Sequence, residues 1–168
     1  MNPPSSFAVL LQRFFSQRLM AQRQVSSHTV ASYRDTFRLL LRFTQQRLSK
    51  SPSHLQLTDI DSDLIGAFLD WLEQHRGIGT RTRNQRLTAI RSFLSFAAME
   101  EPACGGHIAR VLAIPFKRQA RAMVDFLSRQ EIEAILIVPD RRTWIGRRDH
   151  ALLFLAVQTG LRVSELTS

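Results

Sequence analysis

Apolar side chains recur every three or four residues through most of the chain, and this spacing constrains the fold more than any other feature. One long stripe of this kind consists of Val30, Tyr33, Phe37, Leu40 and Leu41. Because an α-helix has about 3.6 residues per turn, such spacing predicts helices with one buried face. The alternation with period two that indicates half-buried strands is weak throughout. We therefore predict an all-α fold.

Capping residues divide this pattern into separate helices. In the first part of the chain we expect helices over about residues 6–23, 28–48, 63–76 and 81–100, and a short one over 107–112. Candidate N-terminal residues precede the longer ones: Ser5 or Ser6, Ser27, Asp61 or Ser62, and Thr80. Their side-chain oxygens can accept hydrogen bonds from free backbone N–H groups. Gly77 is placed to end the third helix, and Leu87, Ile90, Leu94 and Ala97 to form the buried face of the fourth.

The second part of the chain has a different character. Ser128 and Glu131 have the spacing of a capping box and predict a helix over 129–138. Residues 139–148 are predicted to form a loop, and 149–158 a helix ended by Gly160. That last helix is apolar nearly all round, as is typical of helices at the centre of a larger domain. We expect a first domain over 1–116, a basic linker over 117–124, and in 125–168 the opening of a domain that packs poorly by itself.

The charge balance indicates a polyanionic partner. The chain has 23 Lys and Arg against 14 Asp and Glu, a net charge of +9, and all its basic residues except Lys50 and Lys117 are arginines. The planar guanidinium binds phosphate oxygens in pairs, so nucleic acid is the expected partner. One cysteine, Cys104, makes no internal disulfide and no cysteine-based zinc site, and no other metal site or cofactor is expected. Without a signal peptide or an apolar span, the expected location is the cytoplasm and not a membrane.

The segment "TGLRVSEL" places an arginine at a turn between two helices. Gly160 permits the positive φ at which helices commonly end, and Arg162 then lies beside the start of the next helix. The free N–H groups of a helix start favour a bound phosphate next to this arginine. Glu165, three residues on, can hold either the guanidinium or the adjoining turn.

This segment carries a resemblance to a known family. "RRDHALLFLAVQTGLRVSELTS", residues 147–168, resembles the first catalytic box of the tyrosine recombinases, or phage integrases. "FLSRQEIEAIL", residues 126–136, resembles the entry into their catalytic domain, and the preceding helices resemble their core-binding domain. The resemblance implies a SAM-like helical bundle followed by the first helices of a mainly-α catalytic domain that is truncated here.

The resemblance also implies roles for residues. Arg162 would bind the scissile phosphate and stabilise the transition state, and Glu165 would support it. The family further uses a hairpin lysine, a His-x-x-Arg box, a His or Trp and a tyrosine nucleophile, none of which follows Arg162 here. Tyr33 is the only tyrosine, and its place on an apolar stripe predicts a packing residue. We expect a DNA-binding portion of a recombinase or integrase that is itself inactive.

Polar residues outside the core stripes are the candidate DNA contacts. They are His28, Thr29 and Ser32 at the start of the second helix, Arg81, Thr82, Gln85 and Arg86 on the fourth, and Lys117, Arg118 and Arg121 in the linker. By resemblance, the fourth helix would lie against the major groove, where Arg and Gln can address base edges. The linker cations would follow the backbone of double-stranded DNA, and other recombinase protomers are possible partners there.

Two other functions remain open on the sequence. The chain could be a stand-alone, non-enzymatic DNA-binding module or regulator, or an ordinary helix-turn-helix regulator, which leaves "TGLRVSEL" unexplained. The sequence "HIAR" at 107–110 spells His-x-x-Arg but precedes Arg162, so we interpret it as part of a structural helix. The acidic stretch 59–63 lacks the glycine and glutamate of a calcium loop and is better explained as a helix start.

Overall fold

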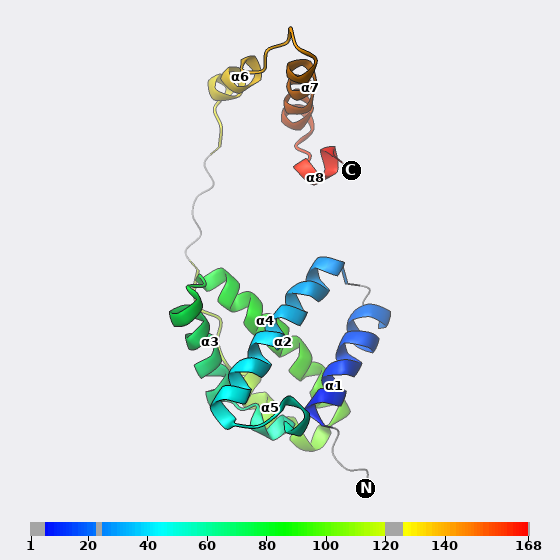
Figure 1. Cartoon of the computed structure of the whole chain (residues 1–168), viewed down its shortest axis with the longest axis vertical. Helices are drawn as coiled ribbons and strands as arrows, with labels where there is room; N and C mark the ends of the chain where they lie inside the picture. Colours follow the sequence, from blue (N-terminus) through cyan, green and yellow to red (C-terminus); the bar gives the residue numbers. More distant parts are fainter. Residues whose placement is uncertain (1–5, 23–24, 120–125, 168) are drawn as a thin grey trace. The chain divides into compact units, whose positions relative to one another are not determined.

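The computed structural model describes residues 6–22, 25–119 and 126–167, which are helical or irregular and contain no strand. The chain divides into two compact units, Met1–Ala120 and Arg121–Ser168, and each is described by itself (Figure 1). Over the described part of the chain, no helix combines the length and the apolar character needed to span a bilayer. The predicted all-α fold is confirmed.

The first unit is a bundle built mainly from α1, α2, α3, α4 and α5. The elements are α1 (Phe7–Arg13), which continues as the π-helical η1 (Phe14–Gln22), α2 (Ser27–Leu48), α3 (Ser62–Arg76), α4 (Thr80–Glu100) and α5 (Gly105–Leu112). Short 3-10 turns connect them: η2 (Pro52–His54), η3 (Leu57–Asp59) and η4 (Pro102–Cys104). Four long helical runs and one short helix follow one another as the sequence predicted.

Side-chain caps begin α1, α2 and α3, whereas α4 begins after Gly79 without one, and Thr80, predicted as its cap, is already inside the helix. The Ser6 hydroxyl accepts a hydrogen bond from Val9 N at 3.4 Å, and the Asp61 carboxylate accepts one from Leu64 N at 2.7 Å. Ser26, not the predicted Ser27, caps α2 by accepting from Thr29 N at 3.3 Å. Two adjacent serines offer the same oxygen, and only the extended backbone at the first of them makes it the cap. Gly77 ends α3 at φ 60°, as predicted.

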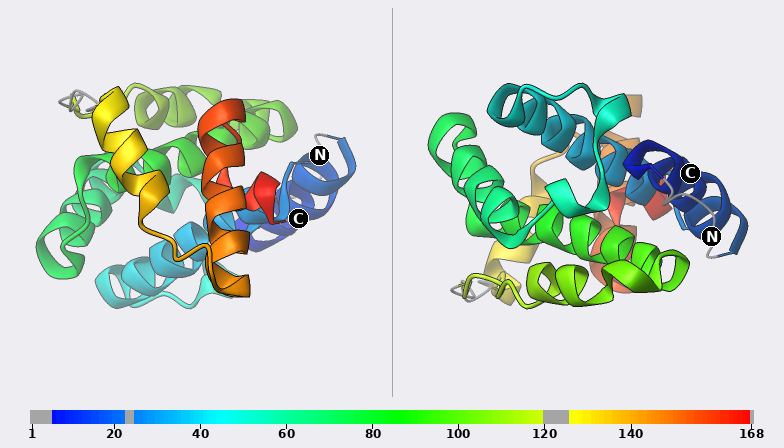
Figure 2. Two further views of the ribbon diagram at one scale, coloured as in Figure 1. Left: turned by 90° about the horizontal axis from the view of Figure 1, so that it is seen from above. Right: turned by 90° about the horizontal axis from the view of Figure 1, so that it is seen from below.

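The core of this unit is organised around α4, which contacts α1, η1, α2, α3 and α5 (Figure 2). The predicted inner face of α4 is confirmed, since Leu87, Ile90, Leu94 and Ala97 are all buried. Phe93, on the same face, makes edge-to-face ring contacts with three other helical elements, at centroid distances of 5.1 Å to Phe7, 5.6 Å to Phe14 and 5.3 Å to Phe37. Such pairs add to the free energy of burying the rings.

Tyr33 and the acidic stretch 59–63 have structural roles, as predicted. Tyr33 packs against the core with its ring stacked on Phe14 at a centroid distance of 6.3 Å. Asp59 accepts a hydrogen bond from Gln56 N at 3.0 Å and pairs with Lys50 at 2.6 Å. Since Asp61 caps α3, these carboxylates serve the starts of η3 and α3.

The second unit contains α6 (Arg129–Ile137), α7 (Trp144–Thr159) and α8 (Val163–Leu166). The predicted capping box is confirmed, because Ser128 Oγ accepts from Glu131 N at 3.2 Å and Glu131 accepts from Ser128 N at 2.7 Å. The loop predicted over 139–148 is wrong in its second half, where α7 already begins. Thr143 caps α7 through Gly146 N at 2.9 Å. A Cβ at Gly146 would lie 2.0 Å from the Asp140 carbonyl oxygen, so this glycine marks a close approach rather than a loop.

Most apolar side chains of the second unit are uncovered. Among residues 126–167 only Gly146 is buried. Phe126 is 91% exposed and Ile137 81%, and on α7 Phe154 remains 49% exposed. A helix that is apolar nearly all round would be covered in a complete domain. The loose packing expected for 125–168 agrees with these exposures.

Candidate nucleic-acid interface

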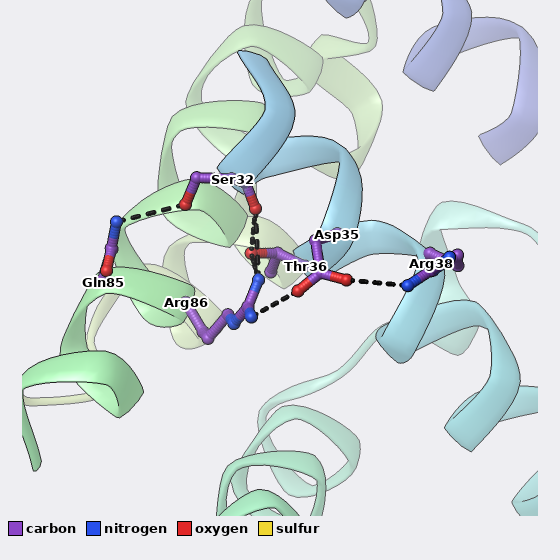
Figure 3. A network of polar contacts seen from close by, with 6 residues as sticks. All are labelled: Ser32, Asp35, Thr36, Arg38, Gln85 and Arg86. Carbon is purple, nitrogen blue, oxygen red and sulfur yellow. Dashed lines mark hydrogen bonds and ion pairs between the residues drawn. The ribbon is translucent and has the colours of Figure 1, made fainter. Parts of the chain in front are cut away.

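The N-terminal halves of α2 and α4 are joined by a set of hydrogen bonds, which we call the α2–α4 network (Figure 3). Gln85 Nε2 donates to the Ser32 hydroxyl at 3.1 Å. Arg86 Nη1 donates to the Ser32 carbonyl at 3.2 Å and to the Thr36 hydroxyl at 3.0 Å. Arg86 Nη2 forms a short ion pair with the Asp35 carboxylate. Three of these residues, Ser32, Gln85 and Arg86, were predicted as DNA contacts, whereas Asp35 and Thr36 were not predicted as site residues.

Arg86 is thereby directed into the bundle and not toward solvent. Its side chain is 16% exposed, whereas Arg38, which pairs with the other oxygen of Asp35 at 3.1 Å, is 63% exposed. Partial burial raises the pKa of Asp35, but the hydrogen bonds and charges of Arg86 and Arg38 outweigh it and hold that pKa below its ordinary value. Arg86 therefore holds α4 against α2, and a DNA contact by Arg86 stays a prediction.

The other candidates on these helices lie in their first turns. His28 and Arg81 are exposed, Thr82 is half-buried, and Thr29 bonds the hydroxyl of the cap Ser26 at 3.0 Å. Neither helix has an acidic residue in its first turn, and α4 follows Gly79, which offers no side chain to the free N–H groups. Neither helix therefore offsets the positive end of its dipole with an acidic side chain of its own first turn. This surface suits the binding of an anion such as a phosphate.

The candidates in the linker have different surroundings. Lys117 Nζ pairs with Glu73 on α3 at 2.6 Å. The Asn84 side chain forms hydrogen bonds with both the N–H and the carbonyl of the Lys117 backbone. Arg118 is exposed, and Arg121 lies outside the described residues. No sequence pattern points to Glu73 or Asn84, because they lie 44 and 33 residues from Lys117 and show no spacing in common with it.

Arg162 lies in the second unit, just after the end of α7. The predicted end of this helix is confirmed. Gly160 ends α7 at φ 66°, and Arg162 is the residue from which α8 starts. Glu165 accepts from Arg162 N at 2.8 Å and from the Arg162 guanidinium at 3.3 Å, so it holds both the turn and the side chain. The Arg162 side chain is 83% exposed and accessible to a phosphate. Its catalytic role stays a prediction.

The remaining histidine and acidic candidates show no catalytic arrangement. His107 on α5 lies with Nε2 3.1 Å from the Ile60 carbonyl oxygen, which fits the structural interpretation of "HIAR". So far as the structure describes the chain, no three His, Cys, Asp or Glu side chains come together as metal ligands do. What the described residues provide is a basic surface on the first unit and an exposed arginine on the second.

Comparisons with known proteins add a family context. Residues 11–101 match the model of the phage integrase N-terminal SAM-like domain. The integrase/recombinase y4rC of Sinorhizobium fredii is 59% identical over 99% of this chain and 50% of its own length. A second protein of that organism with the same kind of name, y4rD, is 46% identical over 95% of this chain and 57% of its own length.

A more distant relative bears the name tyrosine recombinase XerC. The protein from Rhodospirillum centenum is 32% identical over 86% of this chain and 42% of its own length. The chain thus spans about half the length of the curated relatives it matches. No solved structure matches it.

Proposed function

Because this chain belongs to the tyrosine recombinase family, we propose that its first unit is a core-binding domain that binds double-stranded DNA with the N-terminal ends of α2 and α4. The observation that carries the proposal is the α2–α4 network, which holds the N-terminal halves of these two helices against each other. Neither helix has an acidic residue in its first turn, so each helix start would present backbone donors and positive potential to the DNA backbone.

The residues on these two helices would have different roles in DNA binding. Arg81, exposed in the first turn of α4, is the best placed to reach a phosphate or a guanine edge. His28 would add a polar contact from α2. Gln85 and Arg86 face α2, so their main contribution is to hold the surface in shape. Arg118, at the start of the linker, would extend the phosphate contacts.

We propose the division predicted from sequence for the chain as a whole: a DNA-binding domain over 1–116, a linker over 117–124 and a catalytic-domain portion over 125–168. In a complete recombinase, Arg162 would hold the scissile phosphate, with Glu165 orienting it. The single tyrosine of this chain, Tyr33, packs against the core and offers no nucleophile to DNA. Residues 1–168 by themselves would bind DNA without cleaving it, in the cytoplasm and beside other protomers.

Fluorescence anisotropy of a labelled duplex, titrated with the chain over a series of salt concentrations, tests this proposal. The logarithm of the binding constant should fall linearly with the logarithm of salt concentration, with a slope of about −0.9 for each phosphate contacted. On denaturing gels, a nicked duplex should run without a covalent protein adduct. Absence of binding at low salt would refute the DNA-binding proposal, and an adduct would refute the absence of cleavage.

A further inference from the structure

The segment that follows α5 lies along α4 in an ordered way. Residues 114–117, which we call the strap, are irregular in backbone but are bonded to α4 at two points. Arg91 Nη1 donates to the Ile114 carbonyl at 3.5 Å, and its guanidinium stacks over the Phe116 ring at 4.9 Å. Asn84, about two helical turns nearer the start of α4, holds Lys117. The strap therefore runs back along α4 toward the proposed DNA-binding end.

Asn84 holds the end of the strap by pairing with its backbone. Its amide nitrogen donates to the Lys117 carbonyl at 2.8 Å, and its amide oxygen accepts from the Lys117 N–H at 3.1 Å. A side-chain amide carries both a donor and an acceptor, so it satisfies both backbone groups at once. The Lys117 ammonium adds a third contact, to Glu73 on α3 at 2.6 Å. Lys117 is thus fixed by its backbone and by its side chain.

We propose that Asn84 is a positioning residue for DNA binding, because it fixes the point at which the basic linker leaves the first unit; this inference rests on the proposed function. With Lys117 held beside Asn84, the next residue, Arg118, starts within about one helical turn of the exposed Arg81. The Lys117 ammonium is held at Glu73, and the next linker cation, Arg118, is exposed and would be the one to reach a phosphate. A tethered cation acts at a high effective concentration, which falls when the tether is released.

Glu73 is unsuitable for testing this idea, because it also faces a buried arginine. Arg83 is 6% exposed, and its Nε lies 3.5 Å from Glu73. Its Nη1 has no hydrogen-bond partner among the described residues. Removing Glu73 would leave a buried guanidinium without its carboxylate, which destabilises the fold itself. Asn84 lies nearer the surface and has no such second duty.

The experiment uses the full 168-residue chain with the substitution Asn84→Ala. Thr88→Ala is the matched control, because Thr88 lies one turn further along α4 and bonds to the Asn84 carbonyl of its own helix at 2.9 Å. In Asn84→Ala, hydrogen exchange of peptides covering residues 114–117 should accelerate. Affinity for a labelled duplex should fall about threefold to tenfold, and the salt dependence should lose about one phosphate contact. Thr88→Ala should match the wild type in all three.

A second comparison separates anchoring from direct contact. If Lys117 acts as an anchor, the losses in affinity from Asn84→Ala and Lys117→Ala should overlap, and the double variant should lose little more than either alone. Additive losses would show that Lys117 contacts DNA independently and would overturn the inference. Unchanged affinity and salt slope in Asn84→Ala would also overturn it, while wild-type binding leaves the proposed function standing. A wild-type chain that binds no duplex overturns both.

Discussion

Asp35 on α2 accepts bonds from two arginines at once, and the two have different surroundings. Arg86 reaches it from α4 and is mostly covered, whereas Arg38 reaches it from the next turn of α2 and is mostly exposed. Basic side chains of this unit therefore serve two purposes. Some join helices to one another, and others remain exposed to solvent, where a polyanion can reach them.

Replacing Arg86 with alanine should reduce the free energy of unfolding of the first unit by roughly 1–3 kcal/mol, the usual range for hydrogen bonds to charged groups. The substitution leaves the partly buried Asp35, Ser32 carbonyl and Thr36 hydroxyl without their shared donor. Urea unfolding followed by circular dichroism measures this change. The control Arg38→Ala removes an exposed ion pair and should cost less than about 1 kcal/mol. Equal losses in the two variants would contradict the assignment of Arg86 to helix packing.

The stability of the first unit should fall in acid, in part through Asp35. The pKa of Asp35 in the folded chain lies below its ordinary value of 3.8, because the bonds and charges of Arg86 and Arg38 outweigh the effect of burial. The contribution of Asp35 to the free energy of unfolding is therefore complete above the ordinary pKa. It is lost as the pH falls through the lower pKa of the folded state. The urea concentration at the unfolding midpoint should decrease when the pH falls below about 4. In Asp35→Asn this midpoint should decrease less steeply with pH. Parallel pH curves for the two proteins would contradict this.

Arg81→Ala should weaken duplex binding and leave stability nearly unchanged, because Arg81 is exposed in the first turn of α4. Loss of one phosphate contact should make the salt slope shallower by about one unit, and loss of a base contact should cost about 1–3 kcal/mol on one sequence only. Arg110→Ala is the control. It removes the same charge from an exposed position on α5, toward the other end of α4 (Figure 1). Equal effects of the two substitutions would point to net charge rather than to this surface.

Hydrogen exchange of the whole chain should distinguish the two units. Amides in peptides from 151–157 should exchange far faster than those from 87–97, because α7 leaves large apolar side chains uncovered while the inner face of α4 is buried. Exchange followed by mass spectrometry reads both segments from one sample. Native-like protection across 151–157 would mean that α7 is covered in solution.

Features encoded locally were accessible from the sequence. The inner face of α4, the Ser128–Glu131 capping box and the end of α7 at Gly160 each depend on residues within a few positions of one another. The start of α7 was not predicted, because glycine is common in loops. Gly146 instead lies inside the helix, where it permits a close approach to the Asp140 backbone.

Partners distant in the chain could not be read in the same way. Arg86 and Lys117 looked like solvent-facing cations because they lie outside the apolar stripes. Their carboxylates, Asp35 and Glu73, lie 51 and 44 residues away and meet them only after the helices pack. Local periodicity identifies which positions avoid the core, but it cannot separate an exposed charge from one that is already matched.

The central place of α4 has a practical consequence for protein engineering. Its inward positions, such as Leu87 and Phe93, are fixed by contacts with nearly every other helix of the unit, whereas Arg81 near its start is exposed. A combinatorial library confined to exposed positions near the start of α4 would vary the recognition surface while leaving the scaffold untouched. Altered target preference could then be selected without a parallel search for compensating stability.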